Sequence, residues 1–144
     1  MSTIKAAITA VGAYVPDFVL TNKALESMVD TNEEWITSRT GIKERRILKE
    51  EGKGTSFLAI KAAQNLLAKA NVDPLEIDLL IMATATPDMP VASTGAYVAT
   101  EIGATNAFAY DLQAACSSFL FGMSTAAAYI ESGRYKKVLL IGAD

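Results

Sequence analysis

Residues 106–144 read NAFAYDLQAACSSFLFGMSTAAAYIESGRYKKVLLIGAD, and this stretch determines the predicted fold. Residues 106–112 have strand length, and the segment 112–130 that follows has no charged side chain. Gly133 ends the predicted helix, and KKVLLIGAD at 136–144 predicts a second strand. The order strand, helix, strand predicts two parallel strands joined by a helical crossover.

The same alternation continues toward the N-terminus. Residues 79–85, LLIMATA, predict a strand that is covered on both faces, because the whole run is apolar. Further predictions are a strand at 4–11 and helices at 55–70 and 94–102, while TPDMPVAS at 86–93 contains two prolines and predicts a loop. The expected fold class is therefore α/β, with a mostly parallel sheet that helices cover on both faces.

Helix signals also occur between residues 21 and 76. Thr21 or Asn22 is expected to cap a short helix with Leu25, Met28 and Val29 on one face, and Asp73-Pro74 predicts another helix start. The segment Thr31 to Glu34 matches a capping box, which predicts a second helix that orients Trp35. On the helix at 55–70, we expect Leu58, Ala62 and Leu66, with the adjacent Ala59 and Ala63, to face the core. The charged run at 43–53 predicts a loop or a hairpin.

The composition excludes several classes of function. A chain of 144 residues with 51% hydrophobic and 20% charged residues is typical of one globular domain. A net charge of −3 provides no positive field for nucleic acid. With one cysteine and no histidine, we expect no internal disulfide, no metal site, and no Cys-His or Ser-His pair within this chain.

Residues 112–130 contain no charged side chain, which raises the question of a membrane span. Polar Gln113, Ser117 and Ser118, together with flanks that lack a basic cluster, favour a helix buried inside a soluble protein. The N-terminal residues lack the pattern of a signal peptide, so we expect a cytoplasmic protein without membrane contact.

Cys116 is the candidate reactive residue. It lies in DLQAACSSF at 111–119, where the predicted strand ends and the apolar helix begins at about Ala115 or Cys116. Helix N-termini favour thiolates and can hold a developing oxyanion, and sites in open α/β sheets form at the carboxyl ends of strands. The alternative is that Cys116 is a small buried hydrophobic residue, which is common for a lone cysteine.

Four motifs in order resemble the N-terminal half of beta-ketoacyl-[acyl-carrier-protein] synthase III, a condensing enzyme with the thiolase fold. The resemblance covers residues 1–144, and the motifs are VDTNEEWITSRTGIKERR (29–46), ATATPD (83–88), DLQAACSSF (111–119) and SGRYKKVLLIGAD (132–144). It implies one thiolase-like half, with a buried central helix after the nucleophile. The C-terminal half of the family is expected to be absent from this chain.

The resemblance also implies an activity. In the family, the residue matching Cys116 accepts an acyl group from acyl-CoA and then condenses it with malonyl-acyl carrier protein, which releases CO2 and starts fatty acid biosynthesis. A His and an Asn from the second half complete the family site, so the isolated chain is expected to be inactive. Acyl-CoA is a substrate, no cofactor is implied, and a homodimer is expected.

Four further residues receive roles from the resemblance. Thr31, Trp35 and Arg39 match family positions that hold the adenine and phosphate end of CoA, and an indole and a guanidinium suit those groups. Val91 lies where many relatives have a Phe-Pro pair that a dimer partner inserts at the end of the acyl pocket. A smaller Val at this position predicts a deeper pocket that accepts branched or longer acyl groups.

Several alternatives remain open at this stage. Trp35 and Arg39 are also compatible with an ordinary helix surface, and Lys43, Arg45, Arg46, Lys49 and Lys53 could be solvated or could attract an acidic carrier protein. The chain could be another thiolase-fold acyltransferase. It could also be a non-catalytic half that acts as a folding or dimerisation partner, which the absence of His favours.

Overall fold

The computed structural model describes residues 4–144, which form two compact units. The small unit comprises Val15–Lys53. The sheet unit comprises the residues up to Tyr14 together with Gly54–Asp144. Each unit has its own sheet, with two strands in the small unit and three in the sheet unit.

Three parallel strands form the centre of the sheet unit. The order is β4 (Phe108–Leu112), β3 (Leu79–Ala83) and β5 (Val138–Gly142), with Ile81 opposite both Tyr110 and Leu140. All residues of β3 are buried, as its continuous apolar sequence predicts. The expected parallel sheet is therefore confirmed.

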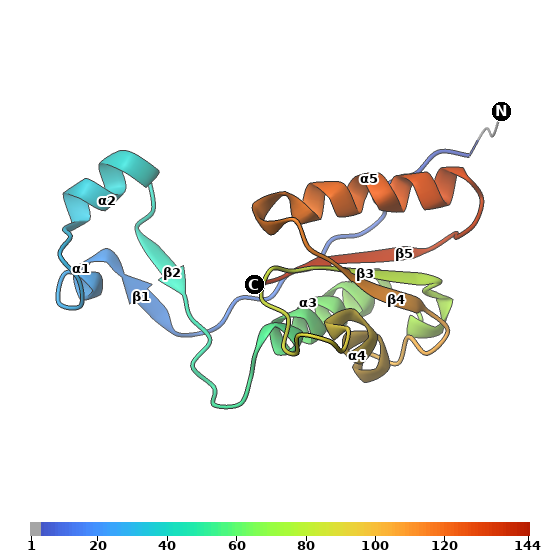
Figure 1. The fold of residues 1–144 in the computed structure, drawn as a ribbon, viewed down its shortest axis with the longest axis horizontal. Coiled ribbons are helices and arrows are strands. Elements are labelled where there is room, and N and C mark those ends of the chain that lie inside the picture. Colours follow the sequence, from blue (N-terminus) through green and yellow to red (C-terminus); the bar gives the residue numbers. More distant parts are fainter. Residues whose placement is uncertain (1–3) are drawn as a thin grey trace. The chain divides into compact units, whose positions relative to one another are not determined.

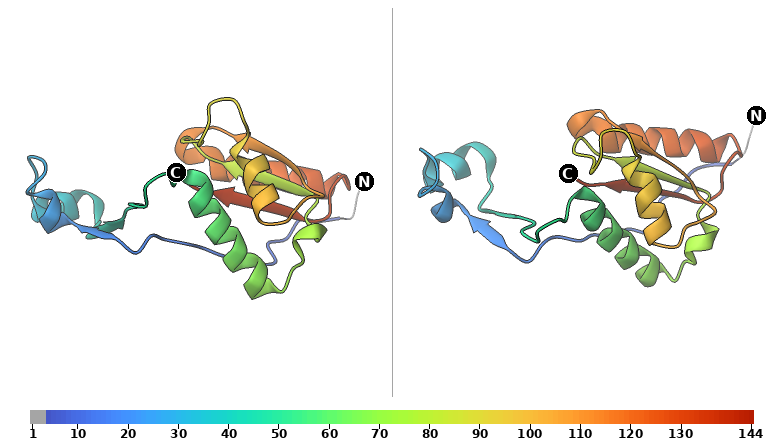
Figure 2. Two further views of the ribbon diagram at one scale, coloured as in Figure 1. Left: turned by 90° about the horizontal axis from the view of Figure 1, so that it is seen from below. Right: turned by 60° about the horizontal axis from the view of Figure 1, so that its bottom comes forward.

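Helices cover both faces of this sheet, as Figure 1 shows. The helices α3 (Thr55–Ala70) and α4 (Thr94–Glu101) lie on one face and contact each other (Figure 2), and α5 (Ser118–Glu131) lies on the other. Side chains alternate along a strand, so Leu80 and Met82 join the core under α3 and α4. That core also includes Ala59, Ala63, Leu67, Val98, Ala99, Ile102, Leu139 and Ile141.

The helix predicted at 55–70 has the expected bounds, and its predicted core face is confirmed at Ala59 and Ala63 but not at Leu58 and Ala62. Ala59, Ala63 and Leu67 are buried, whereas Leu58, Ala62 and Leu66 are only partly covered. Asp73 begins a single 3₁₀ turn at Pro74–Glu76, with the reciprocal hydrogen bonds of a capping box. The predicted start at Asp73-Pro74 is thus confirmed, although no full helix follows before β3.

The strand predicted at 4–11 does not form. These residues have no regular secondary structure, and Ile8 and Val11 are exposed. The segment contacts the sheet unit through an ion pair of Lys5 with Glu131 and packs Gly12 against Leu66, where an added Cβ would lie 2.6 Å from the Leu66 Cβ. An apolar run becomes a strand only with a hydrogen-bonded neighbour, and this segment joins neither β4 nor β5.

The helix α5 is less buried than the sequence predicts. Among its residues only Ser118 and Gly122 are buried, while Phe119, Leu120 and Phe121 are exposed. Gly122 allows the helix to pack closely on the sheet, because a Cβ there would lie 2.5 Å from Leu140 Cδ1. One sheet face covers only one side of a helix, and Leu120 and Phe121 stay exposed. No helix in this described range is both long enough and apolar enough to cross a membrane.

The small unit contains two strands and two short helices. Strands β1 (Val19–Thr21) and β2 (Glu44–Arg46) pair antiparallel, and α1 (Asn22–Leu25) and α2 (Glu33–Thr40) connect them. Asn22 is buried and holds the unit together, since its amide donates to the Ile42 carbonyl at 2.8 Å and its oxygen accepts from Arg45 at 3.0 Å. Thr21 caps α1 as expected. Met28 and Val29 lie beyond α1 and are exposed, so the predicted apolar face is wrong.

The cap of α2 is also different from the prediction. Asn32, not Thr31, is the N-cap, and its side chain accepts from the Trp35 amide at 2.8 Å. Asn32 has extended backbone angles, φ −147° and ψ 163°, which place its oxygen over the first turn. The capping residue still orients Trp35, as expected.

Candidate functional site

The three parallel strands end together at one edge, which we call the carboxyl end of the sheet. Ala83 lies opposite Leu112 and Gly142, so the chain leaves all three strands at the same level. Two predicted site residues follow these strand ends. Cys116 follows β4, and Val91 lies in the loop that follows β3. Open α/β sheets place their ligand sites at this end.

Cys116 lies in a tight turn between β4 and α5. The turn is a short 3₁₀ helix, Ala115–Ser117, and α5 begins only at Ser118. Ala115 has a φ of +47°, a left-handed conformation that is uncommon for a residue with a Cβ. The Cys116 side chain is exposed, so it is not the buried hydrophobic residue of the alternative interpretation.

Two serines stabilise this turn. Ser118 is buried and accepts a hydrogen bond from the Ala114 amide at 2.6 Å, while the Ser117 hydroxyl donates to the Ala114 carbonyl at 2.8 Å. Both hydroxyls are therefore engaged in hydrogen bonds with the backbone. Of the three adjacent candidate nucleophiles, Cys116 is the one that faces solvent.

Carboxylates anchor the loop that follows β3. Asp144, after β5, accepts from the Ala85 amide at 2.6 Å and from the Thr84 hydroxyl at 3.1 Å. Asp88, within the loop, accepts from the Ser56 amide at the start of α3 at 3.1 Å. The loop is thus attached at its beginning and its middle to two other elements of the sheet unit.

Asp111 anchors the other end of the same loop. One of its oxygens accepts from the Gly95 amide at 2.7 Å and from the Ser93 hydroxyl at 2.9 Å. The other accepts from the Thr94 amide at 2.8 Å. Asp111 therefore caps the N-terminus of α4, where a negative charge is favourable.

The tip of the loop, Met89–Ala92, projects between these anchors. Val91 is 97% exposed and Met89 is 53% exposed. Apolar side chains that are this exposed on an anchored loop are available for contact with another surface.

The predicted CoA residues lie in the small unit. Trp35 and Arg39 are four residues apart on α2, and the Arg39 guanidinium carbon lies 4.9 Å from the centre of the Trp35 ring. The indole is 53% exposed, while Thr31 is half-buried just before the helix. An exposed indole beside a guanidinium can stack on a base and bind a phosphate.

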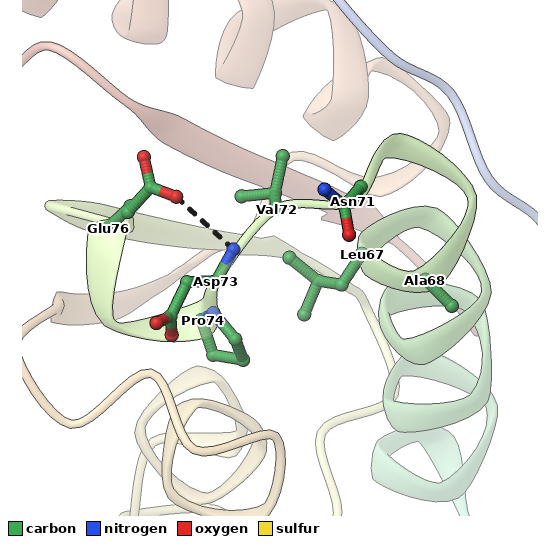
Figure 3. Close-up of a pocket in the computed structure, with 7 residues that line it drawn as sticks. All are labelled: Leu67, Ala68, Asn71, Val72, Asp73, Pro74 and Glu76. Carbon is green, nitrogen blue, oxygen red and sulfur yellow. Dashed lines mark hydrogen bonds between the residues drawn. The ribbon is translucent and has the colours of Figure 1, made fainter.

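Polar groups near the amino end of β3, Glu76 and Asp78, form structural contacts. A surface hollow of about 500 Å³ lies there between the end of α3 and the turn at Pro74–Glu76 (Figure 3). Within it, Glu76 accepts from the Asp73 amide and also pairs with Lys137, which lowers the pKa of the Glu76 carboxyl. The backbone amides of Lys137 and Lys136 lower the pKa of Asp78 in the same region. No nucleophile lines this hollow.

The described residues contain no group of three or more His, Cys, Asp or Glu side chains that could hold a metal ion. Sequence reasoning assigned no role to Asp88, Asp111 or Asp144. The available signal was the position of each carboxylate after an apolar strand, because such residues can reach the helix N-termini at the carboxyl end of the sheet.

Comparison with known proteins identifies similar sequences. The family described as 3-oxoacyl-[acyl-carrier-protein (ACP)] synthase III matches residues 110–144. A curated relative from Bacteroides thetaiotaomicron, named beta-ketoacyl-[acyl-carrier-protein] synthase III 2, is 55% identical over the whole chain. The chain spans only 43% of the length of that relative.

Solved structures of related enzymes also match almost the whole of this chain and less than half of their own length. The chain matches the 3-oxoacyl-[acyl-carrier-protein] synthase III of Aquifex aeolicus with a TM-score of 0.90 and 46% identity, over 96% of this chain and 44% of that one. It matches the priming beta-ketosynthase of the R1128 polyketide pathway with a TM-score of 0.87 and 38% identity, over 92% and 40% of the two chains. These matches confirm the expected thiolase-like α/β fold.

Proposed function

Because this chain is homologous along its whole length to beta-ketoacyl-[acyl-carrier-protein] synthase III, we propose that it is the nucleophile-bearing part of an initiating condensing enzyme of fatty acid biosynthesis. The observation that supports this most strongly is the exposed thiol of Cys116 on a strained turn at the carboxyl end of the sheet. The neighbouring serine hydroxyls bond to the backbone, so Cys116 is the side chain available for attack.

The proposed reaction has two steps. The Cys116 thiolate attacks the thioester carbon of acyl-CoA, a new C–S bond forms, and the bond to the CoA sulfur breaks to release CoA. Malonyl-acyl carrier protein then loses CO2, and the resulting enolate carbon attacks the Cys116 thioester. The cysteine leaves as a thiolate, so the products are 3-oxoacyl-acyl carrier protein, CO2 and free enzyme.

The second step needs hydrogen-bond donors for the enolate oxygen. Residues 1–144 include no histidine. Of the five asparagines, four make side-chain hydrogen bonds to the backbone, at positions 22, 32, 65 and 106, and Asn71 is the C-cap of α3. We therefore assign these donors to a C-terminal half with which this chain functions. The isolated chain is expected to be unable to condense its substrates.

The remaining site residues belong to the same proposal. Trp35 and Arg39, with Thr31, bind the nucleotide end of acyl-CoA, and their exposure and pairing on α2 support this role. Val91 enters the acyl pocket of a second copy in a homodimer, which agrees with its exposure on an anchored loop. The carrier protein and acyl-CoA are then the other partners of a cytoplasmic enzyme.

A second candidate is a priming ketosynthase of another pathway, because a solved enzyme of that kind is 38% identical. It would use the same Cys116 thioester but a different acyl primer or carrier protein. The two candidates differ in substrate and not in the chemistry of this chain.

The test uses the full-length protein with acetyl-CoA, longer acyl-CoA primers and malonyl-acyl carrier protein. The proposal predicts a 3-oxoacyl product that disappears in Cys116→Ala and persists in the control Ser117→Ala. Product formation by Cys116→Ala at the wild-type rate would refute the assignment. Product only with carrier proteins of another pathway would favour the second candidate.

A further inference from the structure

Asp111 connects three elements of the sheet unit. It belongs to β4, five residues before Cys116, and its carboxylate bonds to the last residue of the loop and to the first two residues of α4. Each donor lies within 2.9 Å of a carboxylate oxygen. Charged acceptors make the stronger hydrogen bonds, so this contact is a principal anchor of the loop end.

The absence of a side chain at Gly95 leaves room for this carboxylate at the start of α4. Gly95 is buried, and a Cβ at this position would lie 3.1 Å from the Asp111 carboxylate oxygen, 3.0 Å from Met82 Cβ and 3.2 Å from the Tyr110 carbonyl. Any side chain would therefore push α4 away from β4. Thr94 is also buried, and its hydroxyl accepts from the Asp88 amide at 3.2 Å.

These bonds leave a four-residue tip between two fixed points. Asp88 is held by Ser56 and Thr94, and Ser93 is held by Asp111. The tip between them, Met89–Ala92, contains the fully exposed Val91. The position of Val91 relative to the sheet therefore depends on the Asp111 contact, although Asp111 does not touch Val91.

We propose that Asp111 is a positioning residue for acyl-chain selection, which holds the Val91 tip at a fixed height above the carboxyl end of the sheet. This inference rests on the proposed function, in which Val91 limits the acyl pocket. Without the carboxylate, the start of α4 loosens and the tip occupies several positions. The pocket then no longer has one depth, so discrimination between acyl lengths decreases while Cys116 remains available.

The test compares Asp111→Asn with the matched control Glu101→Gln in the full-length protein. Glu101 is an exposed carboxylate at the other end of α4, so its change removes the same charge without touching the loop. Hydrogen exchange should show protection of the Thr94 and Gly95 amides falling about tenfold in Asp111→Asn only. The kcat/KM ratio between the best and the poorest acyl-CoA should shrink by about threefold to tenfold in the same variant.

Three results would contradict the inference. Unchanged protection of Thr94 and Gly95 would show that the carboxylate does not anchor the loop. A fall in kcat/KM by the same factor for all acyl lengths would show a merely structural role. A wild-type protein that takes no acyl group onto Cys116 would refute the proposed function itself, and the selection role with it, even with protection lost in the variant. If Asp111→Asn does not fold, Ser93→Ala and Ser93→Gly replace it, because both remove the Ser93 bond to Asp111 together with the cap bond that Ser93 accepts from the Ala96 amide. Both should lower the protection of Thr94 and Gly95 and narrow the discrimination between acyl lengths, and an unchanged discrimination in both would contradict the inference.

Discussion

Replacing Ala115 by glycine should stabilise the turn that carries Cys116 relative to the same replacement at Ala114. Ala115 has a φ of +47°, whereas the adjacent Ala114 has a φ of −151°. A left-handed conformation costs an L-residue about 1–2 kcal/mol, and glycine adopts it without this cost. Glycine also raises the entropy of the unfolded chain, which lowers stability by about 0.4–1 kcal/mol at either position.

Backbone strain and unfolded-state entropy combine differently in the two variants. Ala115→Gly should change the free energy of unfolding by between about 0 and +1.5 kcal/mol, because relief of the backbone strain offsets the entropy. Ala114→Gly has only the entropic cost and the loss of a half-buried methyl group, so it should destabilise by about 0.5–1.5 kcal/mol. The entropic cost cancels in the difference between the variants, which leaves the strain at Ala115, about 1–2 kcal/mol, plus the smaller contribution of the Ala114 methyl group.

Urea unfolding of the wild type and both variants measures this difference, and Ala115→Val provides a further check. A β-branched side chain should worsen the strain and destabilise the protein more than Ala114→Gly. If Ala115→Gly is as destabilising as Ala114→Gly, the turn is not strained at Ala115. Backbone strain would then not be the reason that Cys116 is exposed on this turn.

Four further predictions concern other parts of the chain. Asn32→Ala should lower stability by about 1 kcal/mol through loss of the α2 cap, whereas Thr31→Ala should cost much less; equal losses in urea unfolding would contradict the cap assignment. The amides of Lys137 and Lys136 lower the pKa of Asp78, so its stabilisation is complete above the unfolded value of about 3.9 and is lost as the pH falls through the lower folded value. Asp78→Asn should therefore destabilise by about 1 kcal/mol at neutral pH and not at strongly acidic pH, and an equal loss at both would refute this. Trp35→Ala should weaken acyl-CoA binding by about 1–3 kcal/mol, which an unchanged KM would exclude. Val91→Phe should shift the kcat/KM profile toward acetyl-CoA, since each buried methylene contributes at most about 0.8 kcal/mol; identical profiles with a strict acetyl preference in both forms would exclude a deeper pocket.

Local patterns predicted most of the sheet unit correctly. The bounds of α3 depend on residues near one another in sequence, and the burial of β3 follows from its uninterrupted apolar run. The segment at 4–11 has a similar local pattern but no strand, because strand formation depends on a hydrogen-bonded neighbour that its own sequence does not specify. The exposure of α5 could not be predicted for a similar reason, because the burial of a helix depends on the elements that pack against it and not on its own sequence.

In the candidate site, too, the sequence predicts features that depend on neighbouring residues and not those that depend on distant contacts. Cys116 could be identified because the strand, the turn and the helix follow one another directly in the sequence. The role of Asp111 depends on contacts with Ser93 and Gly95, which are 18 and 16 residues away and meet it only in the folded sheet unit. Thr31 and Asn32 are both good capping residues, so the sequence does not show which one caps α2. The backbone angles decide it, because those of Asn32 place its side chain at the first turn.

The most direct test of the central claim is to locate the acyl group on the protein. Full-length protein is incubated with acyl-CoA in the absence of malonyl-acyl carrier protein, so that the second step cannot remove the acyl group, and its peptides are then analysed by mass spectrometry. The account predicts one acyl group on the peptide containing Cys116, cleavable by hydroxylamine as a thioester, and none in Cys116→Ala. An acyl group on another residue, or equal acylation of Cys116→Ala, would contradict it.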